Sequence, residues 1–179
     1  MGRERGQVDD ADVEADARAL ASVIRMRILR LCLDEGLTNK QIAERLGKAP
    51  ATTFHHVRTL AERGFLRAEA ERRGRRGARE VPYRATGKSW RSPMLPGGTR
   101  VLIDTFLSEV AELEDPDSMA VSRLGMRLDE AAYGELWSRL EGVLQDFADR
   151  PPDPEGTPYS LFLAVHEDAA RRDRGRPGS

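Results

Sequence analysis

The stretch that decides the fold runs from Thr38 to Gly64 and reads TNKQIAERLGKAPATTFHHVRTLAERG. Thr38 and Gln41 have the spacing of a capping box, in which each residue binds the other's backbone amide at a helix start. Gly47 suits the left-handed position that follows a helix end, and Pro50 suits the first turn of a new helix. The pattern therefore predicts two short helices joined by a tight turn, the second of which ends at Gly64.

The second helix has two contrasting faces. Val57 and Leu60 are predicted to point into the core. The opposite face carries small or hydrogen-bonding side chains, which suit contact with base edges in a DNA major groove. Together with Lys48 in the preceding turn, the predicted DNA-binding residues of this segment are Ala51, Thr52, His55, Arg58 and Thr59.

After Gly64 the pattern changes to alternating residues. We predict strands over 65–71 and 79–85, joined by a tip over 72–78 in which glycines supply the turn. A basic hairpin directly after a helix-turn-helix is expected to act as a wing, lying along the phosphate backbone or entering a narrow minor groove. Its predicted DNA-binding residues are Arg72, Arg73, Arg75, Arg76 and Arg79.

The charge of the chain is divided unevenly. The net charge is only −1, but residues 40–91 hold 14 Lys and Arg against five Asp and Glu, whereas the rest holds 15 against 25. Only three of the basic residues are lysines, so it is their clustering that is informative, more than the choice of arginine. A basic segment of this kind indicates a polyanionic partner, here double-stranded DNA.

Residues 20–86 resemble the winged-helix regulators of the bacterial ArsR type. The matching segments are LASVIRMRILRLC, LTNKQIAERLGKAPATTFHHVRTLAERGFL and, after the arginine-rich hairpin, VPYRAT. The resemblance implies a homodimer that binds operator DNA, most often as a repressor. Two departures stand out: Thr53 replaces a usual apolar core residue, and the metal-sensing cysteine motif is missing around Cys32. We therefore expect no metal site and no cofactor.

The sequence predicts an α+β fold with a helix-turn-helix, a dimerisation helix and a small C-terminal strand–helix–strand element. Within it, Thr99 is expected to cap the dimerisation helix. Strands are expected over 119–128 and 159–166, on either side of a helix that Asp129 caps. The predicted domains are a disordered N-terminus (1–9), a DNA-binding domain (10–90), a linker and dimerisation helix (91–115), an α/β element (116–168) and a disordered tail (169–179).

Several alternatives bear on function. Trp90 and Trp137 are expected to be core aromatics rather than the lining of a pocket for an unidentified small-molecule effector. Cys32 is expected to be a buried structural thiol, and the adjacent His55 and His56 point in different directions on a helix and make a poor metal pair. No nucleophile, phosphate-binding or metal motif predicts an enzyme. With no secretory signal or apolar run long enough to cross a membrane, we expect a cytoplasmic protein without membrane contact. The alternative function is a winged-helix protein-interaction module.

Overall fold

The computed structural model describes residues 10–74, 77–92 and 97–171. It divides into two compact units, Met1–Pro116 and Asp117–Ser179, and each is described here by itself. The predicted disorder of residues 1–9 and 172–179, and the predicted DNA contacts Arg75 and Arg76, lie outside the described residues.

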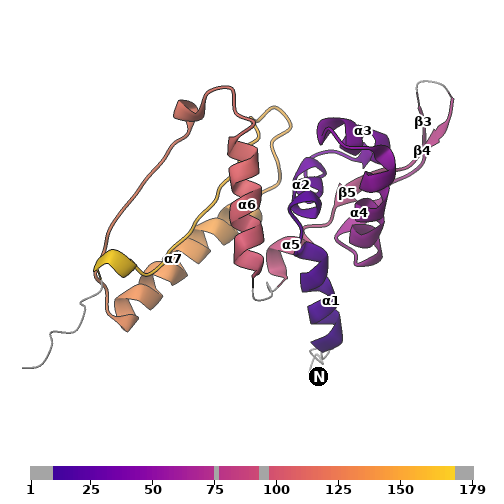
Figure 1. Ribbon diagram of the computed structural model, residues 1–179. Helices are drawn as coiled ribbons and strands as arrows, with labels where there is room; N and C mark the ends of the chain where they lie inside the picture. Colours follow the sequence, from indigo (N-terminus) through magenta and orange to yellow (C-terminus); the bar gives the residue numbers. More distant parts are fainter. Residues whose placement is uncertain (1–9, 75–76, 93–96, 172–179) are drawn as a thin grey trace, which may run out of the picture. The chain divides into compact units, whose positions relative to one another are not determined.

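The first unit is built from helices around a small antiparallel sheet (Figure 1). Its helices are α1 (Asp10–Leu20), α2 (Val23–Leu31), α3 (Asn39–Arg45), α4 (Pro50–Glu62), α5 (Lys88–Arg91) and α6 (Gly98–Val110). A three-stranded sheet has the order β1 (Leu37–Thr38), β5 (Pro82–Ala85), β2 (Leu66–Ala68). A second pair, β3 (Arg72–Arg73) with β4 (Arg79–Glu80), extends the β2–β5 hairpin outward. This arrangement confirms the predicted α+β winged helix-turn-helix.

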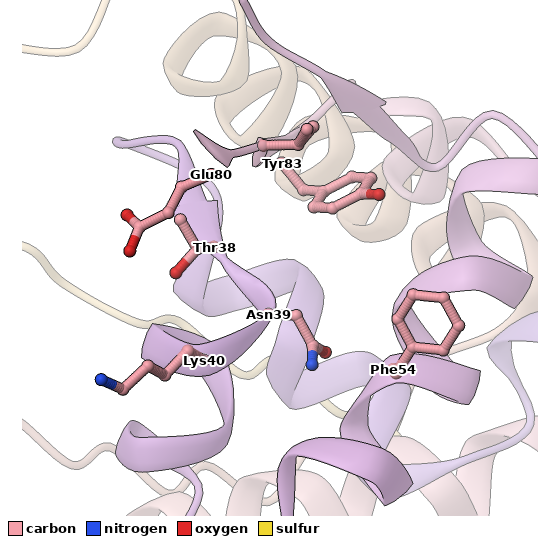
Figure 2. A pocket seen from close by; sticks show the side chains of 7 residues that line it. Thr38, Asn39, Lys40, Phe54, Glu80 and Tyr83 are labelled. Carbon is pink, nitrogen blue, oxygen red and sulfur yellow. The ribbon is translucent and has the colours of Figure 1, made fainter. Parts of the chain in front are cut away.

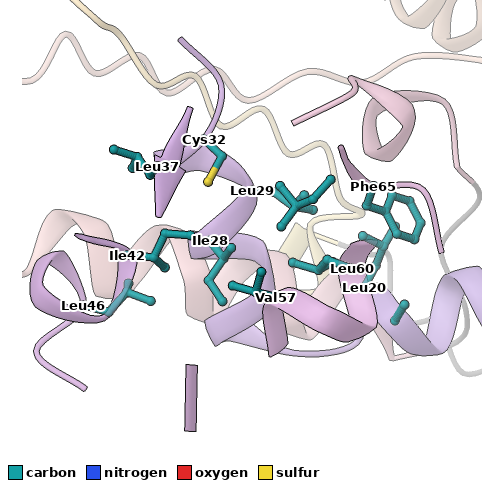
Figure 3. Packing of buried hydrophobic residues seen from close by; sticks show 12 residues of the cluster. Leu20, Ile28, Leu29, Cys32, Leu37, Ile42, Leu46, Val57, Leu60 and Phe65 are labelled. Atoms are coloured by element: carbon teal, nitrogen blue, oxygen red, sulfur yellow. The ribbon is translucent and has the colours of Figure 1, made fainter. Parts of the chain in front are cut away.

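A single hydrophobic core lies among α2, α3, α4 and the sheet (Figure 3). Ile28 and Leu29 of α2 meet Val57 and Leu60 of α4, the two residues predicted to face inward. The core is completed by Ala19, Leu20, Cys32, Leu37, Ile42, Leu46, Phe65 and Leu66. Because α4 buries this one stripe, its opposite face is left free for contact with a partner.

The two helices of the helix-turn-helix are fixed by local chemistry. The capping box is present: the Gln41 amide donates to Thr38 Oγ1 over 3.3 Å, and the Thr38 amide donates to Gln41 Oε1 over 2.9 Å. After α3, Gly47 takes a φ of 61°, a conformation that favours glycine. The amides of Gly47 and Lys48 then bind carbonyls of the last turn of α3. Pro50 is the first residue of α4, as predicted.

Two buried residues, Thr53 and Cys32, carry a hydroxyl and a thiol. Thr53, which replaces a usual apolar residue, is 1% exposed, and its hydroxyl donates to the Ala49 carbonyl over 3.2 Å. Cys32 is fully buried, and this burial raises the pKa of its thiol to about 12. A thiol with such a pKa is not ionised at neutral pH, which agrees with the structural role predicted for Cys32.

The region after the wing differs from the prediction in two ways. A short helix, α5, forms at Lys88–Arg91, where no helix was predicted. Helix α6 begins at Gly98, with Gly97 at its N-cap, so Thr99 lies inside the helix and does not cap it. The left-handed backbone of Gly97, with a φ of 88°, places the helix cap two residues earlier than the side-chain pattern indicated. Helix α6 packs on α2, and Arg30 of α2 pairs with Glu109 at 2.6 Å.

A charged cluster centred on Asp16 joins α1, the end of α4 and α5. Asp16 is 9% exposed, and its carboxylate accepts a hydrogen bond from Arg63 Nε at 2.7 Å and pairs with the Lys88 ammonium. Burial alone would raise the pKa of Asp16, but the hydrogen bonds and charges of Lys88 and Arg63 outweigh it and hold the pKa below its ordinary 3.8. Ionised Asp16 therefore stabilises the folded state.

We expect the Asp16→Asn variant to lower the free energy of unfolding at pH 7 by about 2 kcal/mol, because charge-assisted hydrogen bonds are lost. A group whose pKa is lowered by folding contributes above its unfolded pKa and loses that contribution as pH falls through its folded pKa. The difference in free energy of unfolding between wild type and variant should thus be constant from pH 7 to 5 and decrease below about pH 4. Thermal unfolding at several pH values measures it. Asp12→Asn is the control, because Asp12 meets the same Arg63 but its side chain is 64% exposed.

The second unit contains one long helix, α7 (Glu130–Ala148), with short 3₁₀ turns at Pro116–Ser118 and Ala169–Arg171. Asp129 caps α7 as predicted, accepting from the Ala132 amide at 2.8 Å. The predicted strands at 119–128 and 159–166 are wrong, since the structure has no strand there. Alternation sets side-chain direction, but a strand also needs a neighbour to complete its hydrogen bonds. None of the described residues from Asp117 onward is buried.

Candidate nucleic-acid interface

The outward face of α4 presents most of the residues predicted to contact DNA. Ala51, Thr52, His55 and Arg58 are exposed, as is Lys48 in the turn before the helix. Thr59 is half-buried, and its hydroxyl donates to the His55 carbonyl at 2.9 Å. The helix therefore offers a mixed face of small, imidazole, hydroxyl and guanidinium groups, as base-edge and phosphate contacts require.

The start of α4 is fastened to the start of α3. Asn39 Nδ2 donates to the Pro50 carbonyl at 2.9 Å, so the first turn of the outward helix is held by the helix before it. Rigid placement of this turn matters because residues at the N-terminal end of a recognition helix are the ones that reach base edges.

The two adjacent histidines differ in environment. His55 is exposed, whereas His56 is half-buried. Burial, followed by the charges of Arg25 and His55, lowers the pKa of His56 below 6.5, so its imidazole is neutral at pH 7. His56 is thus a packed residue of the inner flank of α4, and His55 is the one available for a partner.

The wing carries its arginines on the strands as well as at the tip. Arg72 and Arg73 form β3, opposite Glu80 and Arg79 of β4, so the part of the tip predicted at 72–73 is a strand. Arg72 Nη2 donates to Gln41 Oε1 at 2.9 Å, which ties the wing to the first turn of α3. The arginines of β3 and β4 are exposed, so this arm presents a cationic surface beside the helix-turn-helix.

Three of the predicted DNA-binding arginines already have an acceptor within the chain. Arg58 Nε binds Glu62 Oε1 at 2.7 Å, and this carboxylate raises the pKa of Arg58. Arg72 binds Gln41, and Arg79 Nη1 lies 3.3 Å from Glu71 Oε2. All of these side chains are at the surface, where such contacts exchange readily with water and with other acceptors.

One residue of this face was missed by the sequence prediction. Phe54 of α4 is 49% exposed, directly between buried Thr53 and exposed His55. Its ring meets the His55 ring edge-on, with 6.2 Å between the centroids. The helical spacing could have indicated Phe54. It lies three residues after Ala51 and four residues before Arg58, so all three lie on the same side of the helix. Selecting residues by hydrogen-bonding capacity left it out.

The two tryptophans are not core residues, contrary to the prediction. Trp90 of α5 is 55% exposed in the first unit, and Trp137 of α7 is 36% exposed in the second. No residue between 131 and 148 is fully buried, so α7 has no core of its own for Trp137 to join. Each tryptophan is therefore a surface aromatic of its own unit.

Comparison with known proteins identifies the helix-turn-helix. Residues 32–70 match the model of the IclR helix-turn-helix domain, about a fifth of the chain, from the end of α2 to just past β2. No curated protein matches the chain. The matched residues include α3 and α4, and the first unit has a winged helix-turn-helix fold.

Solved structures with a similar fold are distant. Reduced HlyU from Vibrio cholerae is 21% identical, over 59% of this chain and 94% of that one, with a TM-score of 0.37. The homodimeric winged helix-turn-helix DNA-binding domain of Mb0332 from Mycobacterium bovis, described as a possible ArsR-family regulator, is 21% identical. That likeness covers 60% of this chain and 92% of the other, with a TM-score of 0.38. Likenesses of this strength assign neither a ligand nor a partner.

The described residues contain no group of three or more His, Cys, Asp or Glu side chains placed to hold a metal ion. None of the helices in this part of the chain combines the length and apolarity needed to cross a lipid bilayer.

Proposed function

We propose that this protein is a sequence-specific regulator of transcription that binds double-stranded DNA through α4 and the wing. The observation that carries the proposal is the Arg72–Gln41 contact, which holds a cationic arm against the helix pair that presents Thr52, His55 and Arg58. In the bound state α4 lies in the major groove, and the arginines of the wing contact phosphates or the minor groove. The chain is not an enzyme in this proposal.

The proposal includes a homodimer of the ArsR type that acts as a repressor in the cytoplasm. Support comes from the sequence resemblance over residues 20–86 and from the unburied apolar residues of α6, where Leu107 is 55% exposed. Two subunits would bind half-sites about one helical turn apart. A dimer that neutralises roughly six to ten phosphates would lose about three to five decades of affinity between 50 and 200 mM salt.

Selection of bound fragments from a random DNA pool by the full chain tests this function. We expect a palindromic site, and we expect Thr52→Ala and His55→Ala each to relax the base preference at one position per half-site, by about tenfold. Thr99→Ala and His166→Ala are matched controls, because both residues are exposed and belong to neither α4 nor the wing. If genomic fragments are not retarded even at low salt, the proposal fails and a protein-interaction module takes its place.

A further inference from the structure

A cleft of about 400 Å³ separates α4 from the base of the wing (Figure 2). Phe54 of α4 forms one wall and Tyr83 of β5 another, while the N-terminal end of α3 supplies the floor. The lining residues are Thr38, Asn39, Lys40, Phe54, Glu80, Val81 and Tyr83. The cleft thus lies between α4 and the wing, the two elements that contact DNA in the proposed function.

Two sets of contacts hold parts of this cleft in place. Thr38 of β1 pairs with Pro82 of β5, and Leu37 pairs with Tyr83. Asn39 Nδ2 binds the Pro50 carbonyl at 2.9 Å, which fixes α3 to α4. Asn39 Oδ1 is buried and has no hydrogen-bond partner among the residues that the structure describes. These contacts fix the β1–β5 side and the α3–α4 side of the cleft, and the Phe54 side chain that lines it is 49% exposed.

Phe54 is unusual for its position rather than for its exposure, since single exposed apolar residues are common. It is absent from the buried core, and on α4 it adjoins Ala51 and Arg58, both of which are exposed on the proposed DNA face. Lys40 lines the same cleft, and its ammonium is well exposed, with Glu44 3.8 Å away. The charged residues that line the cleft are Lys40 and Glu80, and exposed Arg58 lies one helical turn from Phe54 on α4. An apolar ring close to these two basic residues suits a partner that is anionic overall but offers an apolar group at this point.

Duplex DNA offers one such group in the major groove. The 5-methyl group of thymine is the apolar feature among the donors and acceptors of the base edges, and phenylalanine is one of the side chains that contact it. We infer that Phe54 reads a thymine in each half-site by packing against its 5-methyl group at the mouth of this cleft. The inference rests on the proposed DNA binding and makes Phe54 a specificity-determining residue of that interface.

Replacing single thymines by deoxyuridine tests this inference, because the change removes only the methyl group. On the site selected by wild-type protein, we expect one thymine per half-site at which deoxyuridine weakens binding about fourfold, or about fifteenfold when both half-sites are changed. The Phe54→Ala variant should bind the thymine and deoxyuridine duplexes equally. Phe54→Leu, which keeps an apolar side chain, should retain a preference for thymine.

The controls separate this inference from folding and from DNA binding as such. Phe54→Ala should keep the melting temperature of wild type within a few degrees. Thr99→Ala, at an exposed residue outside α4 and the wing, should keep both the affinity and the deoxyuridine sensitivity of wild type. The inference is overturned if wild type has no deoxyuridine-sensitive position, if Phe54→Ala stays sensitive there, or if the variant weakens both duplexes alike, as loss of a sugar contact would. Failure of the proposed function is distinguishable, since no duplex would then be bound.

Discussion

Replacing Arg72, Arg73 and Arg79 together by glutamine is expected to weaken binding to every DNA sequence by about the same factor. Each lost phosphate contact removes about 0.9 from the slope of log affinity against log salt, which at 150 mM salt is roughly fivefold in affinity. Three contacts per subunit therefore amount to about 100-fold for one half-site. The measurement is a series of binding titrations from 50 to 300 mM salt, on the selected site and on random duplex.

The control for this experiment changes the same number of charges elsewhere. Arg18, Arg123 and Arg139 are exposed and belong to neither α4 nor the wing, so their replacement by glutamine lowers the net charge equally. We expect this control to leave the salt slope unchanged. Equal losses in the two triple variants would show that overall charge, and not the wing, determines affinity.

The largest effect on stability is expected from Phe65→Ala. Phe65 is 1% exposed at the junction of α4 and the sheet, and the ammonium of Lys88 lies 4.7 Å from the centre of its ring. Loss of a buried phenylalanine costs about 3–5 kcal/mol, because the cavity that remains is only partly refilled. We expect the melting temperature to fall by roughly 10 °C or more.

Phe54→Ala is the matched control, since it deletes the same ring from an exposed site eleven residues earlier. Its free energy of unfolding should change by less than about 1 kcal/mol. Thermal and urea unfolding of both variants test this comparison. A loss in Phe54→Ala as large as that in Phe65→Ala would contradict the exposed position of Phe54 and would also count against its role in recognition.

The parts of the fold that were predictable depend on chemistry within a few residues. The Thr38–Gln41 box, the left-handed Gly47 and the first-turn Pro50 each act locally, and all three are present. Strand β1 was not predicted, because two residues show no alternation and become a strand only by pairing with β5 far along the chain. The pairing partner, not the pattern, decides such an element.

The C-terminal unit shows the converse case, in which a strand-like pattern forms no strand because it has no pairing partner. Residues 119–128 and 159–166 have an alternating pattern, but Val121 and Tyr159 are 77% and 91% exposed, and no neighbouring strand completes their backbone hydrogen bonds in the structure. Helix α7, whose hydrogen bonds close within itself, forms as predicted. At the candidate interface, residue type led to the prediction of the polar residues, whereas Phe54 is suggested only by its position on α4.

The internal acceptors of the surface arginines have a consequence for how such a protein would search a chromosome. Glu62, Gln41 and Glu71 already bind Arg58, Arg72 and Arg79, so a duplex competes with these partners for the N–H groups of the arginines. This competition weakens the binding of the arginines to off-target DNA. The protein therefore dissociates from such DNA faster than it would if the same arginines had no internal acceptor. A small number of protein copies would consequently spend less time bound to non-operator DNA and would reach their operator sooner.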